Sequence, residues 1–394
     1  MIHRHRSINC CEEHYLTAVG PSDRTDRAAA RHWLDRVAGT LADHRVAPLQ
    51  ERLLGPMDAR EELLDLRRQA LRSHHLDEDS PCAFVDGRPS GAHGGLGVQL
   101  WGVSSGADGS VTVRTVAGAG HGRGRLLSAP DVRLLWLCDV DGRSEDGRLL
   151  ADTSAQAQRM LTSAVAGLAA HGFTLAQVAR TWIFLRRILD WYDEFNRVRT
   201  AVFEEHGLTG ARGAPPFPAS TGIQGSRAGE ECTMELLAVA GAGGATSLEV
   251  VAESERQNRP FTYGSAFSRA MSLTWHGGET LLVSGTASIG SDGRTRHVDE
   301  PEAQAVETLL AIAALLEPRG CRLSDIAAGT VYFKDATARA AFQRVERQLE
   351  LPRLPLLPMH ADVCRPELLI EIEAAALVPT ERRTDRATGT EEAP

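Results

Sequence analysis

The sequence predicts an α+β fold in which one unit occurs three times along the 394-residue chain. Two observations predict it. A pattern of strand, helix, strand and helix recurs at an offset of 148 residues, between the segment that begins at Ala155 and the one that begins at Ala303. A strand, a link that contains Gly or Pro, and a second strand then follow in both copies and again near the N-terminus. Because self-similarity at a fixed period indicates a repeat architecture, we expect a pseudo-trimer folded from a single chain.

The first copy of the unit is the least regular. Its helical signal is an apolar stripe at Trp33, Val37 and Leu41, spaced as on one face of a helix. An α+β domain can show the same order of elements without kinship, so chance similarity is the alternative for this copy. The predicted elements, in order, are a strand at 13–19, a helix around 33–41, a strand at 49–54, a helix at 60–71 and a strand pair at 81–89 and 97–103.

The second and third copies match each other more closely. Their first helices carry the same apolar spacing, at Leu161, Val165 and Leu168 in one copy and at Leu309, Ile312 and Leu316 in the other. The predicted elements of the second copy are a strand at 132–138, a helix from 155, a strand at 182–186, a helix at 191–205 and a strand pair at 218–225 and 232–239. Those of the third copy are a strand at 280–286, a helix from 303, a strand at 330–334, a helix at 337–349 and a strand pair at 356–363 and 368–373.

Segments of biased composition mark the joins between the copies. Residues 104–109 contain a turn-forming run of Ser, Gly and Asp, and residues 240–246 are rich in Gly and Ala, which is typical of a linker. The polar composition of the C-terminal residues predicts a disordered tail. We therefore divide the chain into units at 1–107, 108–245 and 246–379 and a tail at 380–394.

Composition and charge restrict the classes of function. A hydrophobic content of 42%, without any apolar stretch of membrane length, indicates a globular protein and no membrane partner. The basic N-terminal residues are not followed by an apolar segment, so we expect no secretory signal. Seven scattered cysteines fit a reducing compartment, which indicates the cytoplasm. The net charge of −9, without a basic stripe interleaved with aromatic residues, argues against nucleic acid as a partner.

The sequence shows no signal for a bound metal or cofactor. Cys and His residues lack the paired spacing of metal ligands, and no phosphate-binding loop or dinucleotide fingerprint occurs. We therefore expect neither a metal ion nor a cofactor, and a small carboxylated molecule as the substrate. Since the chain already contains three copies of its unit, we also expect a monomer or at most a weak homodimer.

The C-terminal strand carries the most informative residues. Leu368, Ile370 and Ile372 alternate with Leu369, Glu371 and Glu373, which is the period of a strand with one apolar face. Two carboxylates on the other face are costly unless that face meets water, a partner or a site. If both point inward, repulsion between them raises the pKa of one of the two. Without further information, a solvated strand residue or half of an ion pair between copies is the commoner role for a residue such as Glu371.

The third copy resembles the Rid/YjgF family of small α+β domains, which share a fold class with chorismate mutase-like proteins and assemble as trimers. The resemblance lies in Ser284-Gly-Thr-Ala-Ser-Ile, Gln304, Val331-Tyr-Phe-Lys-Asp and Ile370-Glu-Ile-Glu-Ala, in this order over about 115 residues. It implies sites at the interfaces between units. Imine deaminases of this family hold the substrate carboxylate with an arginine on the penultimate strand, and residues 356–363 contain none.

The chain is more similar to the chorismatases, which hydrolyse the enolpyruvyl ether of chorismate. This resemblance covers roughly residues 125–378. It rests on the C-terminal run from His360 to Glu373, on Arg180-Thr-Trp, on Tyr192-Asp-Glu-Phe with Arg199, on Pro218-Ala-Ser-Thr-Gly-Ile, and on Tyr263-Gly with Phe267-Ser-Arg-Ala. The chain departs from the family after Tyr263-Gly264, where Ser265-Ala266 leads directly to Phe267 without a Pro-Arg-Pro-like insert.

The resemblance implies roles for individual residues. Glu371 corresponds to the proton donor of the family. Cys364, seven positions earlier, and Gly285 correspond to the residues carried by chorismatases that form 3-hydroxybenzoate instead of a dihydrodiol. Protonation of a vinyl ether requires a carboxylic acid that stays neutral near pH 7, and burial of Glu371 in an apolar pocket would provide one. Cys364 is a candidate proton shuttle or nucleophile, with a small packed side chain as the alternative.

Substrate binding is assigned to seven residues. A dicarboxylate requires cations, which bidentate arginines supply best. For every arginine the alternative is a solvated surface role, because arginine makes up 42 of the 43 basic residues. For the other candidates the alternative is plain packing, or close backbone approach in the case of glycine. The candidates are Arg199, Tyr263, Arg269, Gly285, Thr286, His360 and Arg365.

The predicted activity is cleavage of chorismate to pyruvate and 3-hydroxybenzoate in secondary metabolism. Two alternatives remain open from the sequence. One is a Rid-like enzyme that acts on another carboxylated or imine substrate. The other is a ligand-binding or scaffold protein without catalytic activity, which is expected to lack a buried glutamate close to a pair of arginines.

Overall fold

The computed structural model describes most of the chain, and the predicted tail at 380–394 lies outside the described residues. Part of each predicted join, at 106–108 and at residue 243, lies outside them as well. The described ranges are 1–21, 26–86, 88–89, 96–105, 109–211, 213–225, 229–242 and 244–379.

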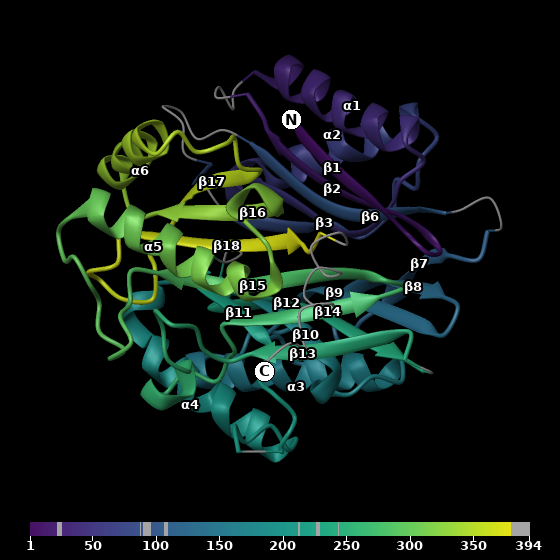
Figure 1. Ribbon diagram of the computed structural model, residues 1–394. Helices are drawn as coiled ribbons and strands as arrows, with labels where there is room; N and C mark the ends of the chain where they lie inside the picture. Colours follow the sequence, from purple (N-terminus) through teal and green to yellow (C-terminus); the bar gives the residue numbers. More distant parts are fainter. Residues whose placement is uncertain are drawn as a thin grey trace, which may run out of the picture.

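Three sheets, each covered by two helices, make up the molecule (Figure 1). The first sheet has the order β1-β2-β6-β3-β4. Its strands are β1 (Ile2–Ile8), β2 (Cys11–Val19), β3 (Ala47–Gly55), β4 (Ala83–Asp86) and β6 (Gly97–Ser105). Its helices are α1 (Arg27–Asp43) and α2 (Arg60–Ser73).

The second sheet has the order β7-β8-β9-β12-β10-β11. Its strands are β7 (Thr112–Ala117), β8 (Arg123–Ala129), β9 (Val132–Asp141), β10 (Val178–Leu185), β11 (Ala219–Gln224) and β12 (Cys232–Gly241). Its helices are α3 (Thr153–Ala170) and α4 (Ile188–Glu205).

The third sheet has the order β13-β14-β15-β18-β16-β17-β5. Its strands are β13 (Thr246–Val251), β14 (Ala270–Trp275), β15 (Gly278–Ala287), β16 (Ile326–Phe333), β17 (Leu356–His360) and β18 (Ile370–Leu377), and β5 (Arg88–Pro89) joins them from the first unit. Its helices are α5 (Pro301–Leu316) and α6 (Ala336–Gln348).

The three sheets repeat one topology, which confirms the predicted three-unit α+β fold. In each unit the strand after the first helix pairs in parallel with the strand after the second helix, as β3 with β4, β10 with β11 and β16 with β17. The same strand also pairs antiparallel with β6, β12 or β18. Each of these antiparallel pairs carries a register shift at the corresponding place, next to Gln50, Arg180 and Ala328. Identical irregularities in three sheets are a stronger sign of repetition than the order of elements alone.

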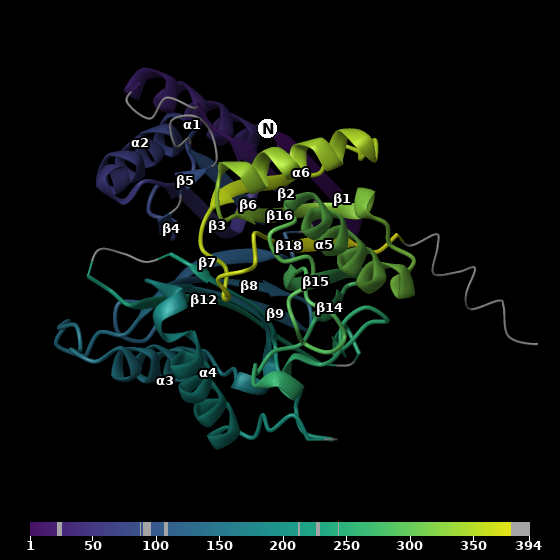
Figure 2. The same cartoon turned by 90° about the vertical axis from the view of Figure 1, so that its left-hand side faces the viewer.

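The apolar residues divide into a shared core and three local ones. The inner faces of all three sheets meet in one cluster, with Trp101, Trp136 and Trp275 among its large side chains. A separate cluster lies between each sheet and its own helix pair. The sheets therefore lie at the centre of the molecule, with the helices outside (Figure 2). None of the helices in the described residues is long and apolar enough to cross a membrane.

At the joins between units, the structure differs from the sequence prediction in the length of one linker and in two additional strands. The predicted linker at 240–246 is shorter than expected, because Ala240 and Gly241 still pair with β9 and β13 already begins at Thr246. The hairpin strands β7 and β13 were not predicted, and in β7 only Val116 is buried. Half-exposed edge strands do not show the apolar alternation on which strand prediction depends.

Candidate functional site

The last strand carries two buried carboxylates into the interface between the second and third units. Ile370 and Ile372 pack with the helix-side core of the third unit, as the alternation in the sequence predicts. Glu371 and Glu373 therefore point to the opposite side of the sheet, toward the second unit. They are only 5% and 3% exposed. Neither side chain is a solvated strand residue.

Glu371 forms the floor of a pocket between the two units. The second unit contributes residues of α4 and β11, and the third contributes β15, β18 and the loops around them. The empty space between the wall residues amounts to about 510 Å³, which includes space open to solvent. It is lined by Tyr192, Arg199, Ser220, Gly222, Tyr263, Ser265, Phe267, Arg269, Gly285, Ala287, Ile289, Cys364, Arg365 and Glu371. A second, wider hollow shares Tyr192, Tyr263, Ser265, Cys364 and Arg365 with it and forms the way in.

Three arginines in the pocket wall bond only to neutral groups of the described residues. Arg199 donates to Asn196 Oδ1 at 2.7 Å, and its guanidinium lies 5.9 Å from the centre of the Phe267 ring. Arg269 donates to the carbonyl oxygen of Asn258 and, at 2.7 Å, to the Tyr263 hydroxyl.

Arg365, the third of these arginines, donates to the carbonyl oxygen of Gly293 at 2.8 Å. Burial lowers the pKa of Arg199 and Arg269 from the usual value, yet both remain cations at any physiological pH. Three positive charges that are not used in ion pairs make the pocket suitable for a carboxylated ligand.

The pKa of Glu371 is raised to about 8, first because burial removes its charged form from water and second because of the negative charge of Glu373. Arg180 acts in the opposite direction. The carboxyl group lies directly over Gly285, so that a Cβ at this position would overlap Oε1 of Glu371. Gly285 thus leaves the space that the acid occupies. The arrangement places a carboxylic acid that is mostly protonated at pH 7 against a cationic pocket.

Cys364 lies at the mouth of the same pocket. Burial, and then the charge of Glu371, raise the pKa of its thiol to about 12. The thiolate is the nucleophilic form of cysteine, and it is scarce at neutral pH for such a thiol. The raised pKa therefore argues against the predicted nucleophilic role of Cys364, and the roles of proton shuttle and packed side chain stay predictions.

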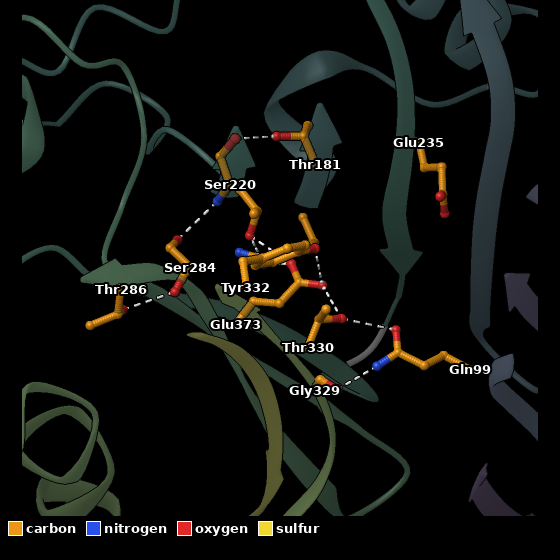
Figure 3. A network of polar contacts seen from close by, with 12 residues as sticks. Gln99, Thr181, Ser220, Glu235, Ser284, Thr286, Gly329, Thr330, Tyr332 and Glu373 are labelled. Atoms are coloured by element: carbon orange, nitrogen blue, oxygen red, sulfur yellow. Dashed lines mark hydrogen bonds and ion pairs between the residues drawn. The ribbon is translucent and has the colours of Figure 1, made fainter. Parts of the chain in front are cut away.

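Glu373 does not reach the pocket wall and is instead enclosed by hydrogen-bond donors. Figure 3 shows its carboxylate beside Thr330 and Tyr332, whose hydroxyls donate at 3.1 and 3.3 Å. Thr221 of the second unit donates to the other carboxylate oxygen at 2.7 Å, and Arg180 Nη2 donates to the same oxygen at 2.8 Å. These partners lower the pKa of Glu373 despite its burial.

Most of the predicted site residues meet in this pocket, and two do not. Thr286 is fully buried next to the register shift in β15, and its hydroxyl donates to the carbonyl oxygen of Ser284. His360 lies at the end of β17, where it pairs with Phe333 of β16, and it is not part of the pocket wall. Thus Glu371, Cys364, Arg199, Tyr263, Arg269, Gly285 and Arg365 line the pocket, while Thr286 and His360 do not.

Sequence reasoning did not assign a role to several wall residues. Tyr192, Ser220 and Gly222 come from the second unit and lie within motifs that the chorismatase resemblance already contained. Their motifs were the available signal. Ser220 and Gly222 sit on β11 beside Thr181 and Ile183 of β10, and this pairing brings them to the interface.

The other two interfaces lack the acid. In the second unit the position equivalent to Glu371, judged by strand pairing, is Thr233 of β12, which pairs with one residue of β10 and one of β9. In the first unit it is Gly97, which pairs with Leu54 of β3. The pseudo-threefold arrangement therefore holds this candidate acid at only one of three equivalent positions.

Comparison with known proteins finds relatives of part of the chain. The chain is 28% identical over 228 residues to a 3-hydroxybenzoate synthase of Streptomyces hygroscopicus, which corresponds to 52% of this chain and 65% of that protein. It is also 28% identical over 217 residues to a chorismatase of Streptomyces rapamycinicus, or 50% of this chain and 63% of that protein. The matches thus span just under two thirds of the length of these relatives. The chain resembles the chorismatases.

The same resemblance holds for the fold. A crystal structure of a chorismatase covers 94% of this chain and 100% of its own, with a TM-score of 0.58 at 19% sequence identity. The fold is therefore that of a chorismatase. A shorter chain, Rv2704 of Mycobacterium tuberculosis, a member of the YjgF/YER057c/UK114 family, covers 34% of this chain at 25% identity with a TM-score of 0.27. No family model matches the chain.

The raised pKa of Glu371 predicts a pH dependence of stability. The folded protein retains the proton of Glu371 up to about pH 8, whereas the unfolded chain loses it near the ordinary value of 4.5. The stabilisation that the folded protein gains from holding this proton is complete below pH 4.5 and is lost as the pH rises to about 8. Relative to Glu371→Gln, which does not titrate, the wild type should lose at most about 5 kcal/mol over this window. Denaturant unfolding of both proteins between pH 4 and 9 measures the difference, and parallel curves would contradict a protonated Glu371.

Proposed function

We propose that this protein is a chorismatase-like enzyme that cleaves the enolpyruvyl ether of chorismate to pyruvate and 3-hydroxybenzoate. The observation that carries the proposal is the buried acid Glu371, with its raised pKa, in a pocket that presents Arg199, Arg269 and Arg365. The names of the two Streptomyces relatives support the same chemistry. The reaction belongs to secondary metabolism, in the biosynthesis of natural products, and takes place in the cytoplasm.

The proposed reaction begins with transfer of the proton of Glu371 to the methylene carbon of the enolpyruvyl group. The resulting oxocarbenium ion is captured by water, and the hemiketal collapses to pyruvate and a ring alcohol. Loss of the ring proton at C3 and of the C4 hydroxyl as water then aromatises the ring to 3-hydroxybenzoate. The water consumed in the first stage is released in the second, so the two products together contain the atoms of chorismate.

The pocket offers a group for each demand of this reaction. The two carboxylates of chorismate require cations, and the guanidinium groups of Arg199 and Arg269 both lie within 6 Å of the Phe267 ring centre. Cys364 is at the pocket mouth, where a thiol that remains protonated can pass a proton during aromatisation. Tyr263, held by Arg269, orients the ligand or a water molecule.

The alternatives are less well supported by the observations. A Rid-like deaminase requires an arginine on the penultimate strand, and β17 carries none. A scaffold without activity gives no reason for a buried carboxylic acid beside arginines that have no carboxylate partner among the described residues. Cleavage of an enol ether uses both features.

Detection of pyruvate is the experiment that tests the proposal. Purified protein is incubated with chorismate, and pyruvate is measured with lactate dehydrogenase while the aromatic product is identified by chromatography. We expect pyruvate and 3-hydroxybenzoate in equal amounts. Absence of pyruvate from chorismate, isochorismate and their amino analogues would overturn the proposed function.

The role of Glu371 is tested by Glu371→Gln, which keeps the shape of the side chain and removes its acidic proton. Turnover should fall by about 10²- to 10⁴-fold because the proton donor is lost, while substrate affinity is retained. Rates come from the pyruvate assay and affinity from calorimetry. Unchanged turnover in Glu371→Gln would defeat this mechanism even if chorismate is the substrate.

The role of Cys364 is tested by the distribution of products. We expect Cys364→Ala to release more dihydrodiol and less 3-hydroxybenzoate, with a smaller loss of total turnover than Glu371→Gln. The physical reason is that the thiol assists aromatisation after the ether has been cleaved. Chromatographic quantification of both products decides the matter, and an unaltered product ratio would remove Cys364 from the reaction.

The proposed quaternary state follows from the fold. The chain contains the three units that Rid-like domains otherwise assemble from separate chains, so we propose a monomer or at most a weak homodimer. Light scattering coupled to size-exclusion chromatography should give a mass close to 42.6 kDa at micromolar concentration. A stable trimer of chains would contradict this expectation.

A further inference from the structure

A buried ion pair behind the pocket has no part in the mechanism described so far. Glu373 of β18 receives a hydrogen bond from Arg180 of β10 at 2.8 Å, and both side chains are almost fully buried. Arg52 of the first unit lies 3.5 Å from the other carboxylate oxygen. Glu373 and the two arginines therefore join all three units at one point. Breaking such a pair leaves an uncompensated buried charge, so its geometry is tightly held.

The surroundings of Glu373 keep it ionised. Besides Arg180 and Arg52, the hydroxyls of Thr221, Thr330 and Tyr332 donate to its two oxygens. A carboxylate that accepts several hydrogen bonds and faces two cations holds its charge even when buried. The negative charge of Glu373 is thus retained at the interface near neutral pH.

This charge lies close to the candidate acid. Glu371 and Glu373 are two residues apart on the same face of β18, which separates their Cα atoms by about 7 Å. Both side chains are at most 5% exposed, so bulk solvent screens their interaction little. Charges at this separation interact strongly where water is absent. The titratable and charged groups around Glu371 are Glu373, Arg180, Tyr192, Tyr332, Cys364 and the three arginines of the pocket wall.

We propose that Glu373 and Arg180 are positioning residues that control, through their opposite charges, how firmly Glu371 holds its proton. The proposal deepens the proposed function and rests on Glu371 being the acid. Glu373 repels the anionic form of Glu371, and Arg180 attracts it. The second unit thus supplies a cation that moderates the proton affinity of an acid in the third.

Because Glu373 and Arg180 carry opposite charges, removal of one or the other should shift the pKa of Glu371 in opposite directions. Glu373→Gln removes the repulsion and leaves Arg180 and Arg52 without a carboxylate at this point, so the pKa of Glu371 should fall by about one unit or more. Arg180→Gln removes the attraction, so the pKa of Glu371 should rise, while Arg52 and the hydroxyl donors keep Glu373 charged. In the double variant both charges are absent and burial again dominates, so the pKa should lie between those of the two single variants.

The titration is measured without substrate. The protein is labelled with ¹³C at the side-chain carboxyl of glutamate, and the resonance of Glu371 is assigned as the one missing in Glu371→Gln. Its chemical shift is followed from pH 5 to pH 10 in the wild type, the two single variants and the double variant. Glu51→Gln serves as a matched control, because it breaks another buried ion pair, with Arg67 in the first unit, at 2.6 Å. This control should lower stability and leave the titration of Glu371 unchanged.

The pH–rate profile gives the second readout. Since the acid must be protonated, activity is lost as the pH rises through the pKa of Glu371. This alkaline limb should move to lower pH in Glu373→Gln and to higher pH in Arg180→Gln. Shifts of the same sign in both variants, or a titration of Glu371 that does not move, would overturn the proposal. If the titration moves as expected and no substrate is turned over, the proposed function fails while the coupling of the three residues stands.

Discussion

The buried ion pair between Glu373 of the third unit and Arg180 of the second is the constraint on which the site depends. Two charges that are removed from water must be paired and hydrogen-bonded, and each of these two side chains finds an oppositely charged partner across the interface. Arg52 extends the pair to Glu235, whose carboxylate also accepts a hydrogen bond from Trp136. These charges therefore hold the second and third units in a defined arrangement. The pocket at Glu371 lies in the interface between the same two units.

The repetition of the fold gives three equivalent interfaces, and the sequence has specialised them differently. The position of Glu371 is taken by Thr233 in the second unit and by Gly97 in the first. A Cβ added to Gly97 would overlap the side chain of Leu357, so the corresponding space at that interface is filled by packing. A chain that carries its three units covalently can concentrate chemistry at one interface and use the others for stability. An assembly of three identical chains has no such freedom.

Much of the site could be predicted because its residues lie in short local motifs. Glu371 and Cys364 share one C-terminal run, and the alternation around Ile370 and Ile372 already separates a core face from a polar face. Thr286 and His360 do not line the pocket, so local motifs did not place every residue. Thr286 sits next to a register shift in β15, and a shift in register changes the face on which a side chain lies. Local sequence does not reveal such a shift.

The sequence by itself determined the order of the elements, the threefold repetition and the presence of two carboxylates on one strand face, because periodicity and repetition are local properties of the chain. Only the tertiary structure decided which of the two carboxylates is an acid and which an anion. Glu371 is buried against Gly285, whereas Glu373 meets Arg180 and three hydroxyls from strands that are distant in sequence. The protonation of a carboxyl group depends on its solvation and on the charges around it, and both are set by segments that come together only when the three units close on one another.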